Sequence, residues 1–111
     1  FIAAVGADSE GKQEIDEALM AAGAVVADLL PQAALIGDLQ HAIGRGFMRV
    51  EDVRAELSTV VAGRAPGRTS AEEITIFDST GIALQDLFAA VAVYENALRH
   101  PQGTERFDFS D

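Results

Sequence analysis

The stretch that decides the fold is residues 1–30, FIAAVGADSEGKQEIDEALMAAGAVVADLL. It opens with an unbroken apolar run, Phe1–Val5, and residues 24–30 form a second such run. Continuous rather than alternating hydrophobicity is typical of strands buried on both faces, as in a parallel sheet. Between the two runs, Ser9–Ala22 has apolar residues at helical spacing and acidic residues near its start. The stretch therefore predicts a strand, helix, strand unit with two parallel strands.

Further helices and one strand are expected downstream of this unit. The patterns predict helices over residues 31–44, 50–63 and 80–99, a strand over 74–77, and an edge strand in the tail 103–111. Residues 62–70, AGRAPGRTS, contain Gly, Pro and Arg without an acid and indicate an irregular, locally basic connection. The fold class is α/β with a parallel sheet that looks incomplete.

Composition narrows the possible functions. A chain of 111 residues with 49% hydrophobic side chains suffices for one small core. Its formal net charge of -10 disfavours nucleic-acid and anionic-membrane partners, which need a concentrated basic face. With no cysteine and only two histidines, neither a disulfide framework nor a zinc site is expected. Because no apolar stretch approaches the ~20 residues that span a bilayer, we expect a soluble, cytoplasmic protein.

The first candidate site is the turn GADSEGK, residues 6–12, which follows the first strand. In open parallel sheets, ligands bind at the carboxyl ends of the strands. Asp8 could act as a general base or bind a substrate amine, and Lys12 could neutralise an anionic cofactor group. Alternatively, Asp8 or Ser9 caps the following helix and Lys12 is a solvated charge. Spacing alone leaves both interpretations open.

The second candidate site is FDSTG, residues 77–81, again a strand end before a helix. Asp78, Ser79 and Thr80 could offer oxygens to a ligand, or they could form another helix cap. The two strand ends would face each other only if their strands lie close in the sheet. Asp28, at the end of the second strand, could be a turn residue or a polar group in the same crevice.

Other polar residues carry weaker signals. Arg64 and Arg68 could bind phosphate or carboxylate, although solvated arginines on a structural loop are the simpler interpretation. His41 and His100 lack a second ligand at metal spacing, which favours surface or helix-end roles. No GxGxxG motif and no Ser/His/Asp set occurs in the sequence.

A family resemblance extends over most of the chain. AVGADSEGKQEID (4–16), VVADLLPQAALIGDLQHAIGRG (25–46) and VVAGRAPGRTSAEEITIFDSTGIALQDLFAAVAVYE (60–95) together resemble the C-terminal part of the ornithine cyclodeaminase and mu-crystallin family. The resemblance runs from Phe1 to about Leu98. It implies that residues 1–79 are the C-terminal portion of a Rossmann-like NAD-binding domain. Residues 80–111 would be a helix and tail belonging to the substrate and dimerisation domain.

Site roles also follow from the resemblance. Asp8 takes the place of the acid that handles substrate protons and contacts the substrate. The segment after the first strand would pass along the nicotinamide side of the cofactor, with Lys12 nearby, and Ser79 matches a cofactor-contacting position. Thr80 matches a substrate-contacting position that is often Val in the family. The implied cofactor-binding residues are Ala4, Val5, Gly6, Ala7, Lys12 and Ser79.

The activity implied is hydride transfer at the α-carbon of an amino acid or cyclic imine, with NAD or possibly NADP as cofactor. Cyclodeaminases, amino-acid dehydrogenases and ketimine reductases all use this chemistry. A homodimer or other homo-oligomer is expected. The alternatives are a non-catalytic, mu-crystallin-like binding or structural protein and a freestanding interaction domain.

The beginning of the chain suggests a larger protein. Phe1 opens directly on a predicted strand, so we expect the trailing part of a longer enzyme. The family's glycine-rich phosphate loop and its Arg and Lys clamp for the substrate carboxylate have no counterpart in these residues. We therefore expect the isolated 111 residues to be inactive and to bind NAD weakly.

Overall fold

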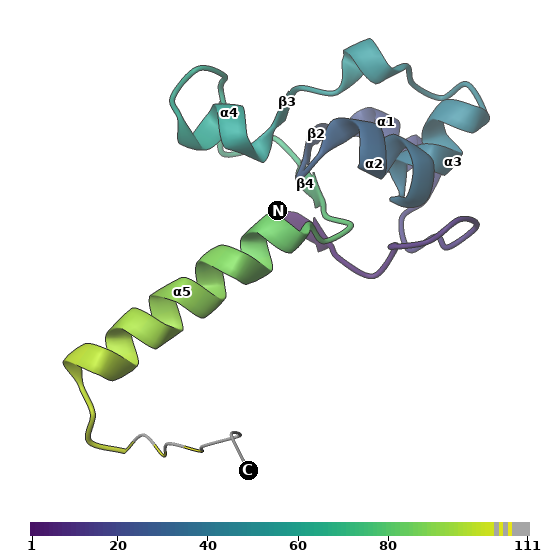
Figure 1. Ribbon diagram of the computed structural model, residues 1–111. Coiled ribbons are helices and arrows are strands. Elements are labelled where there is room, and N and C mark those ends of the chain that lie inside the picture. Colours follow the sequence, from purple (N-terminus) through teal and green to yellow (C-terminus); the bar gives the residue numbers. More distant parts are fainter. Residues whose placement is uncertain (104, 106, 108–111) are drawn as a thin grey trace. The chain divides into compact units, whose positions relative to one another are not determined.

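The parallel sheet is present in the computed structural model, which describes residues 1–103, 105 and 107 (Figure 1). Its strands lie within the first of two compact units, Phe1–Gly81. They are β1 (Ile2–Ala4), β2 (Ala24–Ala27), β3 (Ala55–Glu56) and β4 (Thr75–Asp78). The strand order is β1-β4-β2-β3, and every neighbouring pair is parallel. The predicted α/β class is confirmed.

The centre of the sheet determines where the polar strand ends lie. β4 is inserted between β1 and β2, so the two strands predicted from residues 1–30 are parallel but not adjacent. Asp78 at the end of β4 is paired with Ala4 on one side and with Ala27 on the other. The carboxyl ends of β1, β4 and β2 are therefore level with one another. The condition for the two candidate sites to face each other is met.

The helix after β1 begins later than the sequence predicts. α1 spans Glu17–Ala22, and Asp16 caps it by accepting hydrogen bonds from the amides of Ala18 (2.9 Å) and Leu19 (3.3 Å). Residues 8–16 contain no helix or strand. The interpretation of Asp8 or Ser9 as the helix cap is therefore wrong, and both residues lie in a loop.

Two other helix predictions also need correction. The helix expected over 31–44 is two helices, α2 (Leu30–Ile36) and α3 (Leu39–Gly44). They separate at Gly37, where a Cβ would lie 2.8 Å from both carboxylate oxygens of Asp78. The helix expected over 50–63 is instead a 3-10 helix, η1 (Val50–Asp52), followed by β3 and α4 (Leu57–Val61).

Strand pairing explains the second of these errors. The Arg54 amide donates to the Val25 carbonyl at 2.9 Å, and β3 then pairs with the end of β2. The edge of β2 offers backbone groups that need hydrogen-bond partners, and satisfying them outweighs the helical periodicity of the segment.

The core lies on the face of the sheet that α1, α2 and α3 cover; Figure 1 shows these helices grouped together, away from α4. Its buried members are Ala4, Met20, Val25, Ala27, Ala33, Leu39, Ala42, Met48 and Ile76. Many of these side chains are small, which lets helices and sheet approach closely. At Gly23, for example, a Cβ would lie 2.6 Å from Cδ1 of Ile76.

The second compact unit starts at Ile82 and contains α5 (Ala83–Arg99). The helix predicted over 80–99 is confirmed except for its first three residues. Its large apolar side chains are exposed within this unit, namely Leu84, Leu87, Phe88, Val91, Tyr94 and Leu98. The predicted tail strand includes residues 104, 106 and 108–111, which lie outside the described residues. Nowhere in the described part of the chain is a helix long and apolar enough to cross a membrane.

Candidate functional site

The residues that follow β1 form one side of the candidate site. The Ser79 amide donates to the Ala4 carbonyl at 2.9 Å, so the ends of β1 and β4 run alongside each other. Ala4 and Ala7 are buried, whereas the Val5 side chain between them is 63% exposed. The structure thus brings together the predicted residues Ala4–Ala7 and Ser79 at the carboxyl edge of the sheet.

Asp8 and Lys12 form an exposed ion pair in the loop after β1. Lys12 Nζ donates to Asp8 Oδ1 at 2.5 Å, and the two side chains are 54% and 56% exposed. The hydrogen bond from Lys12, together with its positive charge, lowers the pKa of Asp8 below the ordinary value of 3.8. At neutral pH, Asp8 is therefore an ionised, solvent-accessible carboxylate that can accept a proton or a hydrogen bond.

Asp28 organises the strand end after β4. Its side chain is 5% exposed. Oδ2 accepts hydrogen bonds from the amides of Thr80 (2.8 Å) and Gly81 (2.9 Å) and from the Ser79 hydroxyl (3.1 Å). Oδ1 accepts from the Leu29 amide at 2.7 Å. One buried carboxylate therefore fixes the backbone that carries both Ser79 and Thr80.

Thr80 is only 8% exposed. Its hydroxyl accepts a hydrogen bond from Gln32 Nε2 at 2.9 Å and lies 3.3 Å from Asp28 Oδ1. Gln32 Nε2 also donates to the Gly81 carbonyl at 2.8 Å. The structure shows how the Thr80 side chain is held, and its contact with a substrate stays a prediction.

Asp78 faces the interior rather than a ligand crevice. Its side chain is fully buried and accepts hydrogen bonds from the amides of Leu39 (2.9 Å) and Asp38 (3.3 Å), at the start of α3. The pKa of Asp78 is raised from 3.8 to about 6, mainly by burial and also by the charges of Asp38 and Asp28, against the opposing effect of the two amides. α5, by contrast, begins at Ala83 without a side-chain cap. The interpretation of Asp78, Ser79 and Thr80 as the cap of this helix is therefore wrong.

The arginine loop is used for structure. The Arg68 guanidinium donates to the carbonyls of Ser70, Ala71 and Glu73. Arg54 forms a second anchor through a bidentate pair with the Glu73 carboxylate, at 2.7 and 2.5 Å. The Arg54 hydrogen bond is the main reason that the pKa of Glu73 falls to about 2. These contacts favour the structural interpretation of Arg68 over a phosphate site.

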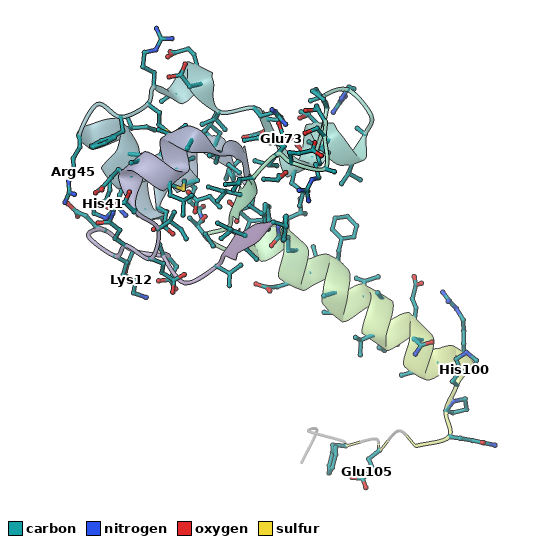
Figure 2. All side chains as sticks on the ribbon, turned by 180° about the vertical axis from the view of Figure 1, so that it is seen from behind. Lys12, His41, Arg45, Glu73, His100 and Glu105 are labelled. Carbon is teal, nitrogen blue, oxygen red and sulfur yellow. The ribbon has the colours of Figure 1, made fainter. Side chains whose placement is uncertain are left out.

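The histidines give no sign of a metal centre. His41 Nε2 donates to the Lys12 carbonyl at 2.9 Å, and Figure 2 shows Lys12 and His41 on the same side of the first unit. His100 lies at the end of α5. Within the described residues, no group of three or more His, Cys, Asp or Glu side chains could hold a metal ion.

Comparison with known proteins identifies the lineage. The sequence model of the ornithine cyclodeaminase/mu-crystallin family matches residues 1–100. The chain belongs to this family. It is 53% identical over 96 residues to iminosuccinate reductase from Paracoccus denitrificans, covering 86% of the chain and 29% of that protein. It is 48% identical over 104 residues to alanine dehydrogenase from Archaeoglobus fulgidus, covering 94% of the chain and 32% of that protein.

Solved structures of family members share the fold. An archaeal alanine dehydrogenase dimer with bound NAD aligns with a TM-score of 0.81 at 47% identity, over 97% of this chain and 34% of that one. Delta(1)-pyrroline-2-carboxylate reductase from Thermococcus litoralis, in complex with NADH and L-proline, aligns with a TM-score of 0.82 at 31% identity, over 95% and 33%. The chain thus spans about a third of the length of the ornithine cyclodeaminase/mu-crystallin relatives that it matches.

Sequence reasoning missed the residues that support the site in this family member. The sequence leaves the role of Asp28 open, and no local pattern marks Asp38 or Gln40 as site residues. Both fall inside the segment predicted as one continuous helix over 31–44. The signal that could have drawn attention to them is Gly37–Asp38, because Gly followed by Asp is a common helix stop and restart.

Proposed function

We propose that the full-length gene product containing this chain is a nicotinamide-dependent oxidoreductase that acts on a small amino acid or its imine. The observation that carries the proposal is Asp8, an exposed and ionised carboxylate at the carboxyl edge of a parallel sheet. The relatives support this assignment, since they include an alanine dehydrogenase, an iminosuccinate reductase and a pyrroline-2-carboxylate reductase. Asp8 and Thr80 are the proposed substrate contacts.

The residues after β1 fit the nicotinamide end of NAD. Because Ala4 and Ala7 are buried, this segment presents the exposed Val5 side chain and the partly exposed Gly6 at the sheet edge, and a ring can pack against this apolar surface. A Cβ at Gly6 would lie 2.1–2.5 Å from the Glu14 carboxylate atoms, so a side chain there would displace the carboxylate that accepts from the Gly6 amide. The family resemblance implies that these residues border the nicotinamide, and no GxGxxG motif for phosphate binding occurs in the sequence. We expect the 111 residues alone to be inactive and to bind NAD weakly.

The chemistry requires a proton acceptor beside the reacting carbon. The hydride acceptor for the α-carbon of the amino acid would be supplied by the oxidised nicotinamide of bound NAD. The Asp8 carboxylate then accepts the proton that leaves the substrate nitrogen as the imine forms, and it returns this proton in the reductive direction. Lys12 lowers the pKa of Asp8, and its ammonium group would attract an anionic part of the cofactor. Ser79, positioned by Asp28, borders the cofactor on the β4 side.

The proposal extends to domain organisation and assembly. Residues 1–79 belong to the NAD-binding domain, and residues 80–111 belong to the substrate and dimerisation domain. The exposed apolar side chains of α5 are suited to a protein interface. Because the archaeal alanine dehydrogenase is a dimer, we propose that a second copy of the protein covers this helix.

Substitution of Asp8 by Asn tests the proposed function. Asn has nearly the same shape but cannot accept a proton, so kcat/KM should fall by about 100-fold or more, whereas KM for NADH should change little. The measurement is NADH turnover by the full-length gene product with pyruvate and ammonia, iminosuccinate and pyrroline-2-carboxylate.

The matched control is Glu10→Gln, which neutralises another exposed acid of the same loop and should keep full activity. An Asp8→Asn enzyme as active as the parent would contradict the proton role. If the parent turns over none of these substrates but still binds NADH, the non-catalytic binding protein becomes the better interpretation.

A further inference from the structure

The loop that carries Asp8 has little structure of its own. Residues 6–16, here called the Asp8 loop, connect β1 to α1. Within this described segment, one backbone hydrogen bond is internal, from the Lys12 amide to the Ser9 carbonyl at 3.2 Å. A chain of this length has many accessible conformations, and each residue that becomes fixed loses conformational entropy. The position of Asp8 therefore depends on contacts from outside the loop.

Asp38 supplies the first of these contacts. Its side chain is fully buried, and Oδ1 accepts hydrogen bonds from the amides of Glu14 (2.7 Å) and Ile15 (2.9 Å). The Glu14 carboxylate in turn accepts from the Gly6 amide at 2.9 Å. Asp38 thus anchors the far end of the Asp8 loop, and Glu14 passes this constraint back to the turn directly before Asp8.

Asp38 does not use its side chain to cap its own helix. It occupies the N-cap position of α3 without a side-chain capping bond, and the cap is supplied by Asp78 from β4. Burying a carboxylate is costly unless it is hydrogen-bonded. The two loop amides compensate this cost at Oδ1 of Asp38, whereas its buried Oδ2 has no hydrogen-bond partner among the described residues.

Gln40, in the first turn of α3, supplies the second set of contacts. Its Oε1 accepts a hydrogen bond from the Gly11 amide at 2.9 Å. Its Nε2 donates to the Gly37 carbonyl at 2.9 Å and lies within 3.4 Å of the carbonyls of Ser9 and Lys12. Gln40 therefore contacts three backbone groups in the middle of the loop, between Asp8 and Lys12, and His41 adds its hydrogen bond to the Lys12 carbonyl.

We propose that Asp38 and Gln40 are positioning residues for Asp8, acting through the backbone of the Asp8 loop. Asp78 in the sheet fixes the beginning of α3 by accepting from the Leu39 amide. α3 in turn positions the loop backbone that carries the Asp8–Lys12 pair. This inference rests on the proposed function, because it gives Asp8 a catalytic task that needs a fixed geometry. Asp38 and Gln40 themselves touch neither substrate nor cofactor in this scheme.

Hydrogen exchange tests whether these side chains hold the loop. Gln40→Ala should raise the exchange rate of the Gly11 amide by about tenfold, since its acceptor is lost. Asp38→Ala should do the same at Glu14 and Ile15, whereas Asp38→Asn should restore protection because the amide oxygen still accepts. Gln32→Ala is the matched control. It removes a glutamine bonded to the other strand end, so exchange in the Asp8 loop should not change.

Steady-state kinetics of the full-length gene product tests whether this hold matters. Gln40→Ala should lower kcat by about tenfold or more with KM for NADH within about twofold, because Asp8 is displaced while the cofactor surface remains. Unchanged exchange at Gly11 overturns the proposal, and so does faster exchange with unchanged kcat. If Asp38→Ala does not fold, Gln40→Ala carries the test alone.

The two proposals can fail separately. A fully active Asp8→Asn enzyme contradicts the proton role of Asp8 but does not alter the exchange rates at Gly11, Glu14 and Ile15. Normal exchange in Gln40→Ala and Asp38→Ala, combined with an inactive Asp8→Asn enzyme, contradicts only the positioning role.

Discussion

The ends of β1 and β4 are neighbours in one sheet, yet they are built in opposite ways. After β4, the backbone turns inward and its amides and hydroxyls converge on the buried carboxylate of Asp28. After β1, the chain runs into the Asp8 loop, where the side chains of Asp8 and Lys12 are more than half exposed. Hydrogen bonds to Asp28 fix the chain after β4, whereas the side chains of Asp38 and Gln40, at the start of α3, hold the chain after β1.

The difference shows where chemistry is available. Around Asp28, the hydrogen-bonding capacity of the carboxylate is taken up by the fold. Asp8 shares only one side with Lys12, so its remaining lone pairs can meet a substrate. The end of β4 is fixed by buried hydrogen bonds, and the end of β1 beside it carries an accessible carboxylate. This arrangement is expected where a reactive group must be held in place by a rigid neighbour.

The largest stability effect is expected at the buried end. Asp28→Ala leaves several buried donors without an acceptor, and each unsatisfied group costs about 1–3 kcal/mol, so we expect a loss of about 4 kcal/mol in the free energy of unfolding. Asp28→Asn should be intermediate, because its amide cannot accept from the Leu29 amide while its oxygen serves Thr80 and Gly81. Urea unfolding measures both variants.

Glu72→Ala is the control for Asp28→Ala, since Glu72 is an exposed acid of the same unit and its loss should change stability little. If Asp28→Ala costs less than about 1 kcal/mol, the two strand ends do not differ as described.

A smaller, pH-dependent effect is expected at Asp78, which links the two ends. The pKa of Asp78 is raised to about 6 in the folded protein, against 3.8 for an ordinary Asp. A carboxyl group whose pKa is raised by folding stabilises the fold at pH values below its pKa in the unfolded state. This contribution is lost as pH rises through about 6. At about 1.36 kcal/mol per pKa unit, the loss is up to about 3 kcal/mol between pH 3.8 and 7.

The measurement for Asp78 is the difference in unfolding free energy between the parent and Asp78→Asn across this pH range. Asn has no proton to lose, so its stability relative to the parent should increase as pH rises from about 4 to 7. Other carboxyls, such as Glu73 with its lowered pKa, contribute equally to the parent and to Asp78→Asn. Their contributions therefore cancel when the two unfolding free energies are subtracted. A pH-independent difference would show that Asp78 does not titrate in this window.

Local sequence patterns predicted the main elements but not their arrangement. The apolar runs indicated β1, β2 and β4, and the long apolar stripe indicated α5. The insertion of β4 between β1 and β2 is determined by tertiary packing, and no local sequence pattern indicates it. β3 was missed for the same reason, because its two residues become a strand only through pairing with β2.

The supports of the candidate site were the hardest features to predict. The Ser79 hydroxyl and the Thr80 and Gly81 amides that Asp28 binds lie 51 to 53 residues further along the chain. The amides that Asp38 binds lie 23 and 24 residues before it. A lone Asp after a strand therefore does not reveal its partners. Glycine at 6 and aspartate at 8 were visible because a turn after a strand is a local pattern.

The smallest stability effect is expected at the exposed end, where Lys12→Gln removes the partner of Asp8. The pKa of Asp8 should rise toward its ordinary value, because Lys12 is the main cause of its lowering.

A carboxyl group whose pKa is lowered by folding favours the fold at higher pH, and this contribution is lost as pH falls through its pKa in the folded protein. Solvent screening makes the contribution small for an exposed pair, so the urea midpoint at pH 7 should be unchanged within error. Carboxyl ¹³C NMR titration reports the pKa directly. If the midpoint instead fell as much as in Asp28→Asn, the Asp8–Lys12 pair would be part of what holds the fold, and the contrast between the two strand ends would be wrong.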